Sequence, residues 1–333
     1  NDCYVMELRT TFEIEPSEIK ITYNDPVLFI GSCFATEIGN QFVAGKMPVL
    51  INPSGTVYNP VSVCNTLDTI TGGKKYTRDD IYNYNGVWLS FNHYTDFSSE
   101  DPENVLESIN SIAERSHRFI STARFLFITF GTARVYRWKG SGRIVSNCHK
   151  IPSSEFTDEL LSPSGIVDLW DEELTKLKSL FPSLKVVFTI SPVRHWKNGA
   201  HGNQVSKSVL FLAVEELMHH PSKPGYFPAY ELIMDDLRDY RFYDDDMLHT
   251  SSAAINYVWQ RFSDCYLDAR TVELRNEVLK VTRAFSHRLT SAPESRKIEF
   301  ARSMIDRIKT IENKIPTIDL TGEKAYFNKI LGE

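Results

Sequence analysis

Short apolar runs alternate with amphipathic stretches along about the first 250 residues of the chain. Four runs contain almost no polar residue, which is typical of strands buried on both faces of a parallel sheet; they span residues 27–30, 48–51, 125–130 and 185–190. The stretches between them have helical spacing and span residues 35–44, 60–70, 101–122, 166–180 and 206–219. A shorter strand is predicted over residues 226–230. This alternation predicts an α/β fold built on a doubly wound parallel sheet.

Two turn signals interrupt the alternation. Asn85-Gly86 lies between aromatic-rich runs, and this dipeptide is the strongest short-range signal for a hairpin. A second hairpin is predicted over residues 133–147, around the glycines of the segment 139–142. We expect both hairpins to be insertions at the ends of strands.

The pattern becomes helical after residue 249, over residues 253–262, 269–285 and 294–314. The chain contains no internal repeat and no linker rich in Pro, Gly or Ser. We therefore expect one catalytic domain over residues 1–265 and a helical C-terminal extension over residues 266–333, packed on that domain.

Composition narrows the possible partners. The chain has 333 residues, 42% of them hydrophobic and 24% charged, as in ordinary globular proteins. Its net charge of -6 gives no basic surface for a nucleic acid, and no apolar run approaches the ~20 residues that cross a bilayer. We therefore expect neither a nucleic-acid partner nor a membrane partner. The sequence leaves the oligomeric state open, a homodimer included.

Cysteine usage favours a reducing compartment. The five cysteines are scattered without a paired spacing, which argues against a disulfide framework; they are Cys3, Cys33, Cys64, Cys148 and Cys265. No secretory signal is visible, so we expect a cytoplasmic protein, or a periplasmic or secreted one if an upstream signal has been removed. No CxxC or HExxH spacing occurs, and we expect no metal and no cofactor.

Ser32 is the first candidate for chemistry. It follows the strand at 27–30 directly and precedes a helix, and sites in open α/β sheets form at the carboxyl ends of strands. A serine there is either a helix cap or a nucleophile. A nucleophilic serine needs a base that a carboxylate orients, and Asp246 and His249 lie three residues apart on one loop. Asp244 and Asp245 are competing candidates for the carboxylate.

Together these segments resemble the GSCFA-domain family of the SGNH/GDSL hydrolases. Gly31-Ser32-Cys33-Phe34-Ala35 reads as its signature, and the resemblance covers roughly residues 8–260. Four further stretches are similar to that family and span residues 52–60, 129–133, 191–195 and 239–243. The resemblance implies a three-layer α/β/α sandwich, flavodoxin-like, with a parallel sheet of about five strands.

The resemblance also implies roles for individual residues. Ser32 matches the nucleophile, His249 the base that takes its proton, and Asp246 the carboxylate that orients the ring. The backbone N–H groups of Ser32 and Gly55 match oxyanion donors, each worth on the order of 3 kcal/mol in the transition state. We expect Ser32 Oγ and a ring nitrogen of His249 to lie within about 3.2 Å, or somewhat further apart without substrate.

One position departs from the family pattern. The SGNH block that begins at Gly131-Thr132 usually supplies an asparagine side chain as an oxyanion donor, and Ala133 cannot donate from its side chain. Candidates to fill this gap, or to bind substrate, come from the neighbouring segments; they are Asn59, His93, Arg194 and His195. Cys33 is an alternative nucleophile, although a cysteine at the start of a helix is more often a packing residue.

The predicted function is hydrolysis of a small acyl ester, O-acetyl in particular, of a carbohydrate or polyol. Two alternatives remain. The same triad serves an O-acyltransferase if the helical C-terminal extension excludes water from the site. A non-catalytic carbohydrate-binding module with a degenerate site is the second alternative, and the missing asparagine favours it.

Overall fold

A five-stranded parallel sheet forms the centre of the computed structural model, which describes residues 9–286 and 293–332. The strand order is β10-β9-β5-β1-β2. The strands are β1 (Val27–Gly31), β2 (Val49–Ile51), β5 (Phe125–Phe130), β9 (Lys185–Ile190) and β10 (Gly225–Tyr226). The predicted α/β fold with a parallel sheet of about five strands is thus confirmed, and the fifth strand is shorter than the predicted 226–230.

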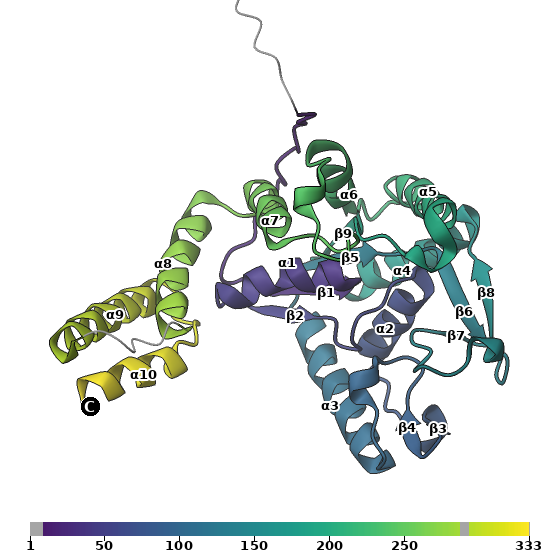
Figure 1. The fold of residues 1–333 in the computed structure, drawn as a ribbon, viewed down its shortest axis with the longest axis horizontal. Coiled ribbons are helices and arrows are strands. Elements are labelled where there is room, and N and C mark those ends of the chain that lie inside the picture. The colour runs from purple at the N-terminus through teal and green to yellow at the C-terminus, as the bar shows by residue number, and fades with distance from the viewer. Residues whose placement is uncertain (1–8, 287–292, 333) are drawn as a thin grey trace, which may run out of the picture.

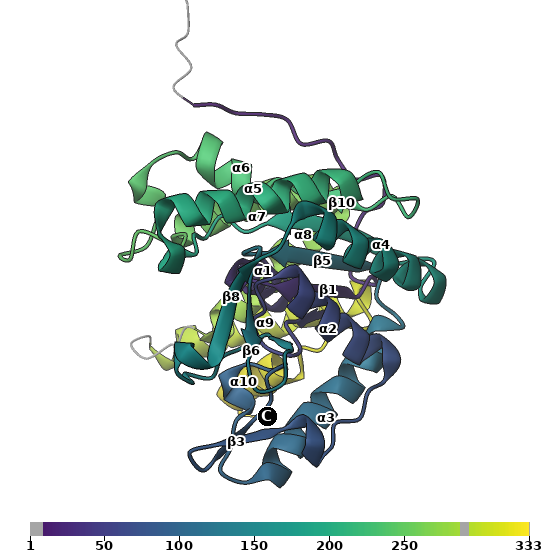
Figure 2. The same ribbon diagram turned by 90° about the vertical axis from the view of Figure 1, so that its right-hand side faces the viewer.

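Helices cover both faces of the sheet, in three layers (Figures 1 and 2). The side chains of β1 alternate: Phe29 points into the cluster formed with α1 (Cys33–Ala44) and α7 (Ser252–Tyr266). Leu28 and Ile30 point to the other face. That face is covered by α2 (Pro60–Gly72), α4 (Pro163–Leu180) and α5 (Gly199–Leu217), while α3 (Pro102–Ile120) packs on α2.

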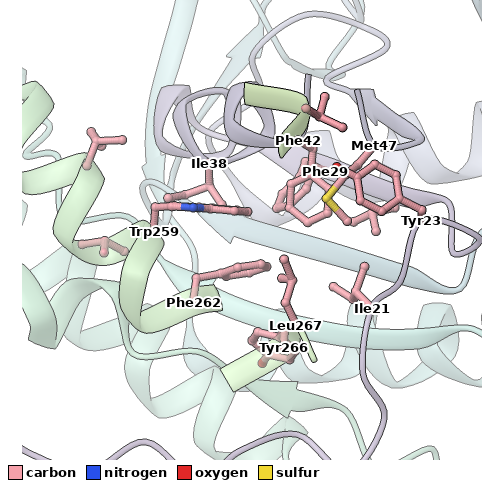
Figure 3. Packing of buried hydrophobic residues seen from close by; sticks show 14 of the residues in the cluster. Ile21, Tyr23, Phe29, Ile38, Phe42, Met47, Trp259, Phe262, Tyr266 and Leu267 are labelled. Atoms are coloured by element: carbon pink, nitrogen blue, oxygen red, sulfur yellow. The ribbon is translucent and has the colours of Figure 1, made fainter. Parts of the chain in front are cut away.

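Aromatic rings fill the layer between α1 and α7 (Figure 3). Phe42 of α1 makes edge contacts with Phe29 and with Trp259, at ring-centroid distances of 5.4 Å each. Phe262 lies against the same rings. Because these side chains are almost wholly buried, they fix α1, and with it the turn at Ser32, on the sheet.

The chain after α7 forms three helices beside the sheet domain (Figure 1). They are α8 (Ala269–Ser286), α9 (Glu294–Lys314) and α10 (Thr321–Leu331), and the sequence pattern had not indicated α10. The guanidinium of Arg275 on α8 donates to the Gln41 carbonyl and lies over the Trp259 ring. Thr282 donates to the Ala44 carbonyl. The extension therefore contacts the C-terminal end of α1, opposite to Ser32.

Small antiparallel sheets form where hairpins were predicted. One consists of β3 (Tyr82–Tyr84) and β4 (Val87–Leu89), and the other of β6 (Arg134–Trp138), β7 (Ile144–Val145) and β8 (Phe156–Leu160). The strand β8 was not predicted, because its sequence Phe-Thr-Asp-Glu-Leu lacks an alternating apolar pattern. The short helical segments in the described residues are α6 (Ala229–Glu231), the π-turn at Leu232–Asp236, and 3-10 turns at Arg78–Asp80, Thr95–Phe97, Ser153–Glu155, Trp196–Asn198 and Tyr240–Phe242.

Two further expectations concern membranes and disulfides. None of the helices in the described residues is long and apolar enough to span a bilayer. Cys33, Cys64, Cys148 and Cys265 are free thiols, and Cys3 lies outside the described residues.

Candidate active site

The turn from β1 into α1 places Ser32 at the carboxyl edge of the sheet. Gly31 has φ +144°, and a Cβ on it would lie 2.2 Å from the Thr129 carbonyl oxygen, so only glycine fits here. The Ser32 N–H donates to the same oxygen at 3.1 Å. The Asn52 side chain accepts from the Gly31 N–H at 2.8 Å and donates to Thr36. Sequence reasoning missed this role of Asn52, which locks the turn from the neighbouring strand.

The Ser32 hydroxyl is buried and makes no hydrogen bond with any described residue. Ser32 is 1% exposed and occupies the N-cap position of α1, yet its side chain caps nothing. The serines at the N-caps of α4 and α7, Ser162 and Ser251, do accept helix N–H groups. An unsatisfied buried hydroxyl costs roughly 1–3 kcal/mol. The cap interpretation of Ser32 is therefore wrong, and the hydroxyl is left available for another partner.

Ser32 lies in a small cavity of about 40 Å³. Its walls come from the loops that follow β1, β5 and β9, together with Tyr58. The wall residues besides Ser32 are Cys33, Tyr58, Gly131, Thr132, Ser191, Val193, Arg194 and His195. A Cβ on Gly131 would lie 3.4 Å from the Ser32 Cβ, so the lack of a side chain at Gly131 leaves space beside Ser32. The cavity has room for about three water-sized groups.

Arg194 and His195 are the two predicted binding residues that line this cavity. Nε2 of His195 is buried and has no hydrogen-bond partner in the described structure. Burial, reinforced by the charges of Lys197 and Lys207, lowers the pKa of His195, so the ring is neutral at pH 7. Its backbone N–H donates to the Asn203 side chain at 2.9 Å. His195 can therefore offer a neutral ring nitrogen to a group bound beside Ser32.

Asp246 and His249 form a hydrogen-bonded pair. The Asp246 carboxylate accepts from His249 Nδ1 at 2.6 Å and from the backbone N–H groups of Leu248 and His249. These bonds lower the pKa of Asp246 to about 2. Among the three neighbouring aspartates, the structure thus pairs His249 with Asp246 rather than with Asp244 or Asp245. The arrangement leaves Nε2 of His249 free to act on another group.

The pair does not touch Ser32 in this conformation. Both side chains are about half exposed, and within residues 9–286 and 293–332 no hydrogen bond joins His249 to Ser32. The expected separation of about 3.2 Å is therefore not reached. A second, outer cavity of about 680 Å³ is lined by Asp246, Met247 and Leu248, and Arg194 lines both this cavity and that of Ser32. A volume of this size is typical of small-ligand sites.

The predicted oxyanion donors are otherwise engaged. The Ser32 N–H donates to Thr129, and the Gly55 N–H donates to the Asn52 carbonyl at 2.8 Å. Gly55 has φ +81° and packs against Tyr94, where a Cβ would lie 2.2 Å from the tyrosine Cβ. Gly55 thus serves a tight turn here, and neither N–H is free in this conformation.

Two predicted binding residues have structural roles instead. Asn59 caps α2, since its side chain accepts from the Ser62 N–H and donates to the Ser62 hydroxyl. His93 is 1% exposed and hydrogen-bonded to Ser90, and burial lowers its pKa to about 4. Both side chains therefore have protein partners in this conformation, and their contact with substrate stays a prediction.

Burial also bears on Cys33 as an alternative nucleophile. Its side chain lines the Ser32 cavity, and desolvation raises the pKa of the thiol above its ordinary value. The thiolate is the nucleophilic form of cysteine, and it is scarce at neutral pH under these conditions. Ser32 is therefore the better candidate.

Lys207 is a further residue at the site that sequence reasoning missed. It is fully buried on α5, and its ammonium donates to the carbonyl oxygens of Gly131 and Ser191 at 2.7 and 2.6 Å. It lies one turn before the buried apolar residue Leu210 and two turns before Val214 of the same helix. No group of three or more His, Cys, Asp or Glu residues in the described parts of the chain is placed to hold a metal ion.

Comparisons with known proteins identify distantly similar solved structures and one protein family. One similar solved structure is a putative platelet activating factor from Streptococcus pneumonia, with 12% identity, 72% of this chain and 83% of the other covered, and a TM-score of 0.38. Another is the acetyl xylan esterase Est2A from the rumen bacterium Butyrivibrio proteoclasticus, with 10% identity, 78% and 65% covered, and a TM-score of 0.35. No curated protein matches the sequence. The model of the GSCFA family matches residues 26–262, and the chain therefore belongs to the GSCFA family.

Proposed function

We propose that this protein is a serine esterase that hydrolyses small acyl esters, O-acetyl in particular, of a carbohydrate or polyol. The observation that carries the proposal is the Ser32 hydroxyl, which is buried, caps nothing and points into a cavity at the carboxyl edge of the sheet. Evolution rarely retains an unsatisfied buried hydroxyl without a use for it. Membership of the GSCFA family supports the same assignment through the matched signature at residues 31–35.

The reaction requires His249 to reach Ser32. The loop that carries the pair is closed on itself, because the Asp244 N–H donates to the His249 carbonyl and Tyr243 bridges to Thr250. The loop is therefore suited to move as a unit across the outer cavity when substrate binds. Catalytic hydrogen bonds often tighten only in the complex with substrate.

In the proposed mechanism, Ser32 Oγ attacks the acyl carbon while Nε2 of His249 takes the hydroxyl proton. The bond between the acyl carbon and the alcohol oxygen then breaks, and His249 returns the proton to the leaving alkoxide. Water then attacks the acyl-enzyme and gives a proton to His249; the bond between the acyl carbon and Ser32 Oγ breaks, His249 returns the proton to Ser32 Oγ, and the carboxylic acid leaves. Asp246 holds the imidazolium throughout, and its low pKa keeps it ionised.

The cavities support the substrate class. About 40 Å³ beside Ser32 holds roughly three heavy atoms, the number in an acetyl group, which favours short acyl groups. The outer cavity carries exposed aromatic rings at its rim, Trp196 and Tyr240, whose flat faces suit sugar rings. Arg194 lies between the two cavities, where it can donate to an ester or hydroxyl oxygen.

Hydrolysis of p-nitrophenyl acetate tests the proposal. We expect Ser32→Ala and His249→Ala to abolish turnover, whereas His201→Ala, an exposed histidine on α5, serves as a control that retains it. A fluorophosphonate should label Ser32, and mass spectrometry should locate the adduct there. Turnover should fall steeply from acetyl to octanoyl esters. Unchanged turnover in both loss-of-function variants would contradict the mechanism.

Two alternatives give other outcomes in the same assays. An O-acyltransferase would partition the acyl group to an added sugar rather than to water. The contacts of α8 with Gln41 and Ala44 lie about 14–18 Å along α1 from Ser32, which does not favour a water-excluding cover from the C-terminal extension. A carbohydrate-binding module without catalysis would leave Ser32 unlabelled by the fluorophosphonate.

A further inference from the structure

Lys207 is buried without a carboxylate partner. It is 0% exposed, and its ammonium nitrogen contacts two backbone carbonyls, those of Gly131 and Ser191. None of the ion pairs between described residues includes Lys207. Lysine is almost never fully buried unless it is paired, because desolvation of the charge is expensive. We therefore expect Lys207, which is retained despite this desolvation cost, to have a function.

The two carbonyls that Lys207 holds belong to the walls of the Ser32 cavity. Gly131 follows β5 directly and Ser191 follows β9 directly, and both residues line that cavity. The N–H groups of Gly131 and Thr132 donate to the Tyr58 carbonyl, which fixes the same wall from the other side. Lys207 thus joins the ends of two neighbouring strands at the place where the acyl group is proposed to bind.

Two more buried polar residues on the same face of α5 complete the arrangement. Asn203 and Ser206 precede Lys207 by four residues and by one, and they are 2% and 3% exposed. Ser206 accepts from the Ala133 N–H at 2.8 Å and bonds to the Thr132 hydroxyl, while Asn203 accepts from the His195 N–H. The family pattern places its asparagine at Ala133, and here that position is instead anchored to α5 through its backbone.

We propose that Lys207 is a positioning residue of the Ser32 site, which holds the loops after β5 and β9 in place and supplies the positive charge that stabilises the oxyanion. The inference rests on the proposed esterase function and deepens it. Because the Lys207 ammonium is fully buried, its charge acts in a low local dielectric, where it stabilises developing negative charge strongly. Lys207 thereby replaces part of what the absent asparagine supplies in related enzymes.

The charge of Lys207 depends on pH in the working range. Burial, the largest cause, lowers the pKa of Lys207 to about 7; the thiol of Cys33 acts in the opposite direction and the guanidinium of Arg194 in the same direction. His195 is the third titratable group that faces it, and burial keeps that ring neutral. The stabilisation of the oxyanion by the Lys207 charge should therefore weaken as pH rises above about 7.

Substitution of Lys207 in the full chain tests this role. Lys207→Met keeps the length of the side chain and removes its donors. We expect kcat for p-nitrophenyl acetate to fall on the order of 10- to 100-fold, with KM within about threefold, since misplacement of reacting groups acts on the transition state. Lys176→Met is the matched control, because Lys176 is a partly buried lysine on α4 in an ion pair with Glu173, and its kcat should stay near that of the wild type.

The pH dependence of kcat/KM distinguishes an effect of the Lys207 charge from a purely structural effect of the side chain. In the wild type, kcat/KM should decline above pH 7, and the decline should be absent in Lys207→Met. If Lys207→Met fails to fold, Lys207→Gln, which retains an uncharged N–H donor group, and the wild-type profile decide the question. A flat wild-type profile from pH 7 to 9, or a kcat of either folded variant within threefold of the wild type, overturns the inference. Failure of the esterase function itself is distinct, because the wild type would then neither turn over the ester nor react with a fluorophosphonate.

Discussion

Ser32→Ala should make the protein more stable while it removes the nucleophile. The hydroxyl is 1% exposed, has no partner among the described residues and caps no helix N–H, so its loss removes no interaction. It removes a desolvation cost of roughly 1–3 kcal/mol. We expect the free energy of unfolding to rise by about 1 kcal/mol, which corresponds to about 2 °C in Tm for a chain of this size.

Ser206→Ala is the matched comparison, since Ser206 is equally buried but hydrogen-bonded. Its loss leaves the Ala133 N–H without an acceptor and deprives Thr132 of a partner, at a cost of roughly 1–3 kcal/mol. The two alanine variants should therefore move the unfolding free energy in opposite directions, by about 2–4 kcal/mol relative to each other. Calorimetry and urea unfolding at pH 7 measure the difference. A Ser32→Ala protein destabilised as much as Ser206→Ala would refute the reasoning, because the hydroxyl would then be satisfied in solution.

Three other predictions concern His249, Cys33 and His93. His249→Gln should lower kcat by on the order of 100-fold or more with an unchanged Tm, measured by ester turnover and calorimetry, because the side chain is half exposed. Cys33→Ser should retain turnover within a few-fold, because the raised pKa leaves little thiolate to lose. His93 has a pKa of about 4 in the folded protein against 6.5 for the free side chain, so the unfolded chain binds a proton first and stability should fall as pH drops from 6.5 to 4. Urea unfolding at several pH values across that range should show that the unfolding free energy of His93→Phe depends less on pH than that of the wild type. An equal pH dependence would contradict the assignment.

The sheet was predictable because its central strands are buried on both faces. The runs at 27–30, 125–130 and 185–190 contain almost no polar residue, and the structure places them side by side as β1, β5 and β9. The edge strand β8 carries three consecutive polar residues, and its pairing with β6 is decided by tertiary context. Helix α5 begins at Gly199, before the predicted residue 206, because the glycines at 199 and 202 concealed its first turns.

The site was predictable only where its residues are close in sequence. Ser32 follows its strand directly, and Asp246 and His249 lie three residues apart, so local pattern identified them. Lys207 contacts Gly131, a residue 76 positions away, and no local pattern indicates such a contact. The assignment of Gly55 as a donor relied on its motif, whereas its N–H orientation depends on the turn at Asn52.

Helix α1 has a practical consequence for handling the protein. Its first turn carries Ser32 and its last turn is held by Arg275 and Thr282 of α8. The ion pair between Lys46, just after α1, and Glu323 of α10 ties the last helix to the same end. A solid support or a fusion partner attached at the C-terminus is thus joined to the molecule about one helix length from the proposed nucleophile. Immobilisation through that end keeps the support at the end of α1 that lies away from Ser32.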